Sequence, residues 1–318
     1  MIDLHTHTTR SDGADEPATL LARARDIGLT TLSITDHNTV AAYRDPCMGR
    51  LDELFPGTLL RGVEITCLHQ GEIVEVLGYC FDLDAMESLL ADMVLPFEEK
   101  QLRESRLIAT ALRNAGARFD EDAISFDPSR ESSRKAYWRE LLRHPENRGL
   151  ATLDESWGSS RAFTRNEVYN PKSRLFVDES SLYPSLGDAV DLIHEARGVA
   201  QLAHLHEYAS ADELRSCLWE TVGRIGLDGV ECAHSCFDEA QTVDLEEFDR
   251  FHGLVMSGGS DYHGSRKPGI ELGRGRGNVC VPEDYLETWP SDALERGAVR
   301  EKPSVSPNPG LTCCREEG

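Results

Sequence analysis

Several short apolar segments of this chain end in a histidine or an acidic residue, and this pattern constrains the fold more than any other feature. The segments end at His5 with His7, His37, Glu64, His204, His234, and Asp261 with His263. Helical segments alternate with these predicted strands, and alternating β and α units favour a parallel sheet. An open sheet would concentrate its site at one switch point, whereas a barrel gathers functional residues wherever its strands end at one face. The pattern therefore predicts an α/β fold of the (β/α) barrel type.

The chain opens with MIDLHTHTTRSDG, an alternating strand followed by a turn. Residues i and i+2 of a strand point the same way, so His5 and His7 are expected to share a face. Asp12 follows in a turn marked by Ser11 and Gly13. Histidine and carboxylate ligands without cysteine suit Zn, Mn or Fe. We therefore expect a divalent cation here, with further ligands from other strand ends.

The regular alternation of strands and helices stops in the middle of the chain and resumes at Leu186. The intervening segment is rich in arginine and has mostly helical spacing. We predict a barrel formed by 1–82 and 186–300, a mostly helical inserted subdomain over 83–185 that covers the site, and a disordered tail over 301–318. The smaller predicted elements are a helix from Thr39, a turn at Gln70 and Gly71 between two β segments, and a last strand over 278–282.

Composition excludes several classes of protein. No run of eighteen or more apolar residues occurs, so we expect no membrane span. The N-terminus lacks a basic-then-apolar signal, which predicts a cytoplasmic protein. The net charge of −23 repels polyanions, so we expect no long nucleic acid as a partner. The nine cysteines are an odd number, which is a poor basis for a disulfide framework.

Taken together, the segments HTH, SDG, TDHNT, GVEIT and GSDYH resemble the motifs of the PHP family, named for polymerase and histidinol phosphatase domains. The resemblance covers roughly 1–82 and 186–282 and is strongest to stand-alone phosphoesterases. It implies a distorted seven-stranded (β/α) barrel, similar to a TIM barrel, with two or three divalent ions (Mn, Fe or Zn).

The function that the resemblance implies is metal-dependent hydrolysis of a phosphate ester of a small molecule, by a hydroxide that two ions hold. A nucleotide or sugar phosphate is the expected substrate, as a phosphomonoester or a cyclic phosphodiester. The alternative is a catalytically inactive PHP module that binds a phosphorylated ligand or a protein partner.

The resemblance also assigns metal ligands, motif by motif. The ligands of the first ion would be His5, His7, Glu64 and Asp261, and those of the second would be Asp12, His37 and His263. A third ion would share Glu64, with Glu75 and Ala136 standing where the family has two histidines. We therefore expect a weaker third site that depends on Glu75, and we count Asp261 as catalytic as well as a ligand.

Further residues are expected to contact the substrate. His204 in QLAHLHEY matches a family histidine and is a candidate proton donor, although Leu205 stands where the family has proline. Arginine suits the oxygens of a phosphoryl group. The residues expected to contact the substrate are His234, Lys267 and Arg134, with Arg130, Arg161 and Arg165 as alternatives to Arg134.

Overall fold

A computed structural model of the chain describes residues 1–299, so the predicted tail over 301–318 lies outside the described residues. Seven strands form one sheet in sequence order. They are β1 (Ile2–Asp3), β2 (Thr31–Ile34), β3 (Thr58–His69), β4 (Glu72–Tyr79), β5 (Val199–Leu202), β6 (Gly229–His234) and β7 (Val255–Gly259). The α-helices are α1 (Pro17–Asp26), α2 (Leu51–Leu54), α3 (Leu83–Met93), α4 (Phe97–Asn114), α5 (Ser133–Leu141), α6 (Ser160–Phe163), α7 (Leu186–Glu195), α8 (Ala211–Ser216), α9 (Leu218–Ile225), α10 (Glu239–His252) and α11 (Ser291–Gly297).

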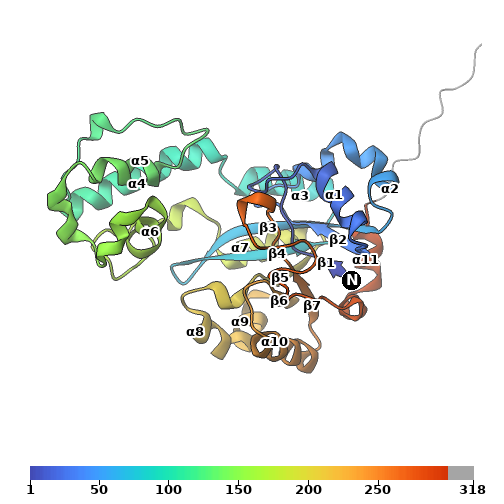
Figure 1. The fold of residues 1–318 in the computed structure, drawn as a ribbon. Coiled ribbons are helices and arrows are strands. Elements are labelled where there is room, and N and C mark those ends of the chain that lie inside the picture. The colour runs from blue at the N-terminus through green and yellow to red at the C-terminus, as the bar shows by residue number, and fades with distance from the viewer. Residues whose placement is uncertain (300–318) are drawn as a thin grey trace, which may run out of the picture.

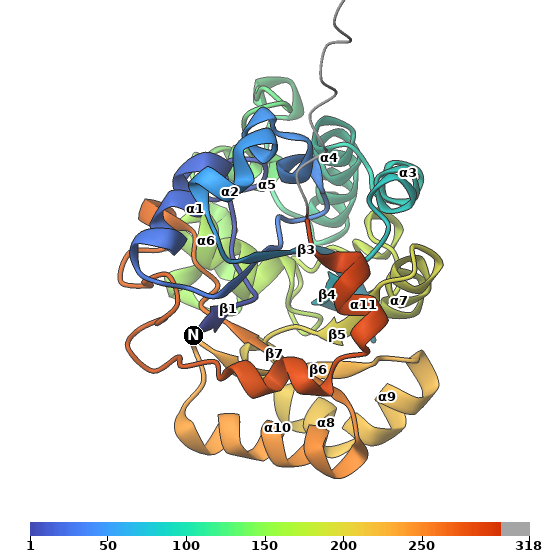
Figure 2. The same ribbon diagram turned by 90° about the vertical axis from the view of Figure 1, so that its right-hand side faces the viewer.

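The sheet closes on itself between its first and last strands. Leu4 N donates to Gly258 O at 3.1 Å, and Asp261 N donates to His5 O at 2.9 Å. Figure 2 shows the strands around a common centre, with helices such as α1, α7 and α10 outside them. The predicted fold class, a distorted seven-stranded α/β barrel, is therefore confirmed.

One strand departs from a regular (β/α) barrel. β4 pairs antiparallel with β3, from Gly62 opposite Tyr79 to His69 opposite Glu72, and it is antiparallel to β5 as well. The predicted turn is confirmed at Gln70 and Gly71, which have φ values of 52° and 88°. The expectation of a parallel sheet is thus wrong at β4, because a hairpin replaces the crossover helix that a parallel neighbour requires.

Three smaller predictions also differ from the structure. β1 ends at Asp3, and the backbone around the two histidines pairs with the segment after β7 instead. The helix expected from Thr39 is replaced by short 3-10 turns, because Pro46 restricts Asp45 to extended backbone. The last strand predicted over 278–282 is reduced to one bridge between Val281 and Ile2.

Two separate hydrophobic cores are present. The main core lies between the sheet and its helices and includes Met86 and Leu90 of α3. The second core includes Ile108 of α4, Leu141 of α5 and Phe163 of α6. Figure 1 shows these three helices in a lobe beside the barrel, and we call residues 97–183 the helical lobe. The exact domain boundaries stay a prediction.

Among residues 1–299, no helix combines the length and apolar character that crossing a membrane requires.

Burial of an acidic residue on α10 predicts a pH-dependent stability. Asp249 accepts hydrogen bonds from Val230 N at 3.2 Å and Cys232 Sγ at 3.3 Å, and burial raises its pKa to about 7. The folded protein keeps a proton that the unfolded chain releases above its ordinary pKa of 3.8. The free energy of unfolding should therefore fall as pH rises from about 4 to about 7, by at most roughly 4 kcal/mol.

The test compares Asp249→Asn with the unaltered chain by urea unfolding between pH 4 and pH 8. The variant should lose less stability over this range, because its amide does not ionise. Asp92→Asn, at an exposed position of α3, is the control. Parallel stability curves for all three proteins would contradict the prediction.

Candidate metal centre

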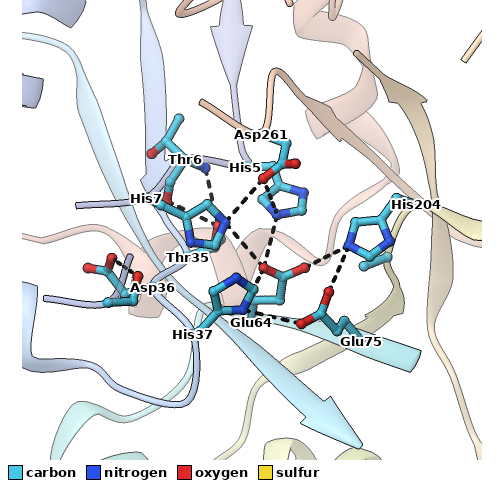
Figure 3. Close-up of polar contacts among 12 residues, drawn as sticks. His5, Thr6, His7, Thr35, Asp36, His37, Glu64, Glu75, His204 and Asp261 are labelled. Atoms are coloured by element: carbon cyan, nitrogen blue, oxygen red, sulfur yellow. Dashed lines mark hydrogen bonds and ion pairs between the residues drawn. The ribbon is translucent and has the colours of Figure 1, made fainter. Parts of the chain in front are cut away.

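Histidine and acidic side chains from several strand ends converge at one end of the barrel, with Glu64 at their centre. Figure 3 shows the rings of His5, His7, His37 and His204 around its carboxylate. Glu64 Oε2 lies 3.3 Å from His5 Nε2, 3.2 Å from His7 Nε2 and 3.1 Å from His37 Nδ1. Its other oxygen lies 2.9 Å from His204 Nε2. Asp261 Oδ1 completes this group at 3.4 Å from His7 Nε2.

The residues predicted for a second ion lie at the rim of the same cluster. Asp12 Oδ1 is 3.1 Å from His263 Nε2 and 3.7 Å from His37 Nε2. The Asp12 side chain is 58% exposed, whereas Glu64 is 1% exposed. The rim is therefore the side from which solvent or a ligand reaches the cluster.

Glu75, predicted to replace a histidine at the third site, also reaches the cluster. Its carboxylate lies 3.3 Å from His37 Nδ1 and 3.2 Å from His204 Nε2. His204 thus stands between Glu64 and Glu75, and its role as a proton donor stays a prediction. Ala136, matched earlier to the second third-site histidine, lies in α5 of the helical lobe.

The residues predicted to contact the substrate divide into two groups. Lys267 Nζ donates to Asp261 Oδ2, and His234 Nε2 lies 3.5 Å from the same oxygen. Arg134 instead forms ion pairs with Glu104 and Glu179 in the helical lobe. Among residues 1–299, it makes no ion pair or hydrogen bond with the cluster. The structure therefore does not bring Arg134 to the metal-type residues.

The backbone is unusual where it carries these side chains. His204 and Asp261 have positive φ values of 23° and 56°, a conformation that costs energy for residues with a side chain. A Cβ at Gly13 would lie 2.5 Å from His7 O, and one at Gly259 would lie 2.4 Å from His5 N. The glycines of the SDG and SGGSD segments are therefore needed for the close approach of backbone to the two histidines.

Two buried acids that support the cluster were missed in the sequence. Glu231 Oε1 lies 2.8 Å from His5 Nδ1, which leaves His5 Nε2 free to face the cluster, and Glu231 Oε2 accepts from His204 N. Asp36 accepts from Thr8 N at 2.7 Å and from Ser11 Oγ at 2.6 Å, which holds the turn before Asp12. Asp36 lies within the TDHNT motif itself, and the signal for Glu231 was an acid inside the apolar strand GVECAH.

Opposite charges determine how the cluster titrates. Burial opposes the ionisation of His7, but the carboxylates of Asp261 and Glu64 beside its ring raise its pKa to about 9. Burial likewise opposes the ionisation of Glu64, yet the neighbouring His5 and His37 hold the pKa of its carboxyl well below its usual range. A cation bound at these nitrogens would take the place of their protons.

The donor atoms fit divalent ions. Within residues 1–299, several of them are buried without any hydrogen-bond partner, namely His5 Nε2, His7 Nε2, His37 Nδ1, Glu64 Oε2 and His263 Nε2. Their lone pairs converge without satisfying one another, which is costly unless an ion completes the site. Several groups have ligand atoms within 4.8 Å of one another, and they include His7, Asp12, His37 and His263; His5, His7 and Asp261; and His5, Glu64 and His204.

Fold and site together define the class of protein, an α/β barrel with a buried cluster of histidines and carboxylates that could hold metal ions. Residues 3–151 match the family model of the PHP domain. This match confirms the resemblance seen in the motifs of the chain.

Named relatives extend this comparison along nearly the whole chain. The chain is 29% identical over 295 residues to the 5'-3' exoribonuclease Rnm of Salmonella typhimurium, covering 90% of this chain and 93% of that protein. It is 27% identical over 277 residues to the 3',5'-nucleoside bisphosphate phosphatase of Chromobacterium violaceum, covering 86% and 90%. It is 28% identical over 267 residues to the phosphoribosyl 1,2-cyclic phosphate 1,2-diphosphodiesterase of Eggerthella lenta, covering 82% and 94%.

A solved structure supports the fold. The crystal structure of a protein assigned as a metal-dependent phosphoesterase from Bifidobacterium adolescentis matches with a TM-score of 0.59 at 24% identity. The match covers 93% of this chain and 96% of that chain, so the shared fold includes the helical lobe as well as the barrel.

Proposed function

We propose that this protein is a metal-dependent hydrolase of phosphate esters whose substrate is a small nucleotide or sugar phosphate. The observation that carries the proposal is the convergence of buried, unpartnered donor atoms around Glu64. Three relatives named for exoribonuclease, phosphatase and phosphodiesterase activity all act on phosphoric ester bonds.

Two ions would be held here, one by His5, His7, Glu64 and Asp261 and the other by Asp12, His37 and His263. When bound, such ions lower the pKa of water and neutralise phosphate oxygens. Glu231 holds the ring of His5 in one orientation. Lys267, beside Asp261, supplies a positive charge to the phosphoryl oxygens, and His234 is a second donor next to it.

A cavity beside the rim of the cluster suits the organic part of a substrate. Its volume is about 610 Å³, and it begins at Asp12 and His37. Its far wall, which connects α3 to α4, carries Val94, Leu95 and Phe97. Small-molecule sites are commonly apolar cavities of about this size. A base or sugar is therefore the group that we place here.

Exonucleolytic cleavage at the end of an RNA is a second candidate function. The relationship to the Salmonella exoribonuclease over 90% of this chain favours it. The net charge of −23 opposes binding of a long strand. The two candidates therefore differ chiefly in the size of the substrate.

The test is a panel assay with purified protein and Mn²⁺. The panel contains nucleoside monophosphates, a nucleoside bisphosphate, a sugar phosphate, a cyclic phosphodiester and a short 5'-phosphorylated RNA. Fastest turnover of a small ester supports the proposal, and fastest turnover of the RNA supports the second candidate. Bound metal without turnover of any compound would favour an inactive module that binds a phosphorylated ligand.

The third ion should be weak and should depend on Glu75, because Glu64 is shared with the first ion and His37, which also lies near both carboxylates, is assigned to the second ion. Glu75→Gln should selectively empty this position and leave two ions per chain. Elemental analysis and anomalous scattering from crystals grown without phosphate would measure this. Glu72→Gln, on the same strand, is the control. A third ion at full occupancy in the variant would contradict the prediction.

A further inference from the structure

Direct pairing between the neighbouring strands β4 and β5 stops at the edge of the metal-type cluster. The ladder between them ends with Val76 opposite Leu202. One step further, Ala203 N donates to Glu75 O at 3.0 Å, but within residues 1–299 Glu75 N does not donate to Ala203 O in return. Two residues in a hydrogen-bonded antiparallel pair normally exchange both bonds. One ladder bond is therefore missing at the residue that carries a candidate metal ligand.

A phenol hydroxyl takes the place of the missing bond. The hydroxyl of Tyr208 accepts from Glu75 N at 2.9 Å and donates to Ala203 O at 3.0 Å, the nearer of its two carbonyl acceptors. A direct bond would bring this nitrogen and this oxygen to about 2.9 Å from each other. The inserted hydroxyl holds them further apart, so Tyr208 both joins and separates the two strand ends.

The separated strand ends carry Glu75 and His204. His204 directly follows Ala203 and has the positive φ of 23°. Figure 3 shows its ring between the carboxylates of Glu64 and Glu75, and its Nε2 lies 2.9 Å and 3.2 Å from them. The edge of the Tyr208 ring meets the same imidazole, with 5.5 Å between ring centroids. One side chain thus contacts the backbone of Glu75 and the ring of His204.

The segment after β5 places Tyr208 by local geometry. A single 3-10 turn over Leu205–Glu207 returns the chain toward the strand end, with Glu207 N donating to His204 O at 2.8 Å. Because such a turn takes about three residues, Tyr208 lies little more than one turn after His204. From β3, Thr66 Oγ1 donates to Glu75 Oε1 at 3.2 Å. The carboxylate of Glu75 is therefore held from β3 and its backbone from Tyr208.

We propose that Tyr208 is a positioning residue, whose hydroxyl fixes the spacing between Glu75 and His204 and thereby the place of both beside Glu64. This inference rests on the proposed function and deepens it, because the predicted third ion needs Glu75 at a fixed position. Without the hydroxyl, Glu75 N and Ala203 O either lose their partner or bond to each other directly. Either outcome moves Glu75 relative to His204.

The first test measures Mn²⁺ binding to the full chain by titration after chelation, with no ester present. Tyr208→Phe should weaken the site that depends on Glu75 by about tenfold and change the other affinities by less than about twofold. Tyr285→Phe is the matched control, because it removes a hydroxyl that donates to Glu246 of α10 from a side chain that is 1% exposed. The control should bind every ion as the parent chain does. A lower unfolding temperature of Tyr208→Phe with every Mn²⁺ affinity unaltered would show a merely structural role and overturn the inference.

The second test is a double-mutant cycle on kcat in the metal-loaded full chain, with the ester that the panel assay selects. Tyr208→Phe should lower kcat by about tenfold in the parent chain and by about threefold or less in the Glu75→Gln background. The second loss is smaller because Tyr208 acts through Glu75. Equal losses in the two backgrounds would overturn the inference. Loss of the Mn²⁺ site in Tyr208→Phe, in a chain that turns over no ester, would overturn the proposed function alone.

Discussion

Asp261→Ala should lower turnover of phosphate esters by more than about a hundredfold while the barrel still folds. Asp261 contacts His7 and Lys267 and forms, with His5 and His7, a group whose ligand atoms could hold an ion. Burial opposes its ionisation, but His234 and His7 hold the pKa of its carboxyl well below its usual range. The carboxylate is therefore charged at neutral pH, and its removal deletes an anionic ligand.

The measurements are steady-state kinetics with saturating Mn²⁺ and thermal unfolding of the chelated protein. Asp261→Asn is a second variant, because asparagine tolerates the positive φ of 56° at this position. Asp244→Ala removes an ion pair with Arg215 far from the motifs and is the control. Near-normal turnover of Asp261→Ala with metal present would show that Asp261 is not a ligand.

Glu64→Gln should release metal from the whole cluster and abolish turnover, again by more than about a hundredfold. Its carboxylate contacts His5, His7, His37 and His204, so every predicted ion lies next to it. The substitution keeps the shape of the side chain and removes the negative charge. Neutral glutamine would leave several histidines facing one another without a counter-charge.

Metal content per chain, measured after equilibration with a fixed concentration of free Mn²⁺, is the main measurement. Glu99→Gln, which loses an exposed ion pair with Arg103, is the control. Glu64→Asp should recover part of the metal content, because it restores the charge at a shorter reach. If Glu64→Gln kept the metal content of the parent chain, the central role of Glu64 would be wrong.

Much of the barrel and of the candidate site is predictable from the sequence because the signals are local. An apolar strand that ends in histidine or an acid is visible in a few residues, as in TDHNT or GSDYH. In a barrel, the ends of successive strands meet at one face. The strands were predicted separately, and their ligand-type residues lie in one cluster in the structure.

The features of the site and the sheet that the sequence did not predict depend on contacts between residues far apart in the chain. The pairing of His5 with Glu231 spans 226 positions, and that of His204 with Glu64 spans 140. The sequence around His5 or His204 does not indicate which distant residue each will contact. The antiparallel pairing of β4 with β5 likewise joins distant segments, because Val76 lies opposite Leu202.

The arginines show the difference most clearly. Sequence determined that the chain contains Arg134, Arg161 and Arg165 in one polar segment, each able to bind a phosphate. Packing of the lobe pairs Arg134 with Glu104 and Glu179, and it leaves Arg161 and Arg165 on a cavity wall without an ion-pair partner among residues 1–299. Charge is a property of the residue alone. Whether that charge is already neutralised depends on which acids the fold brings within reach, and only the tertiary structure decides that.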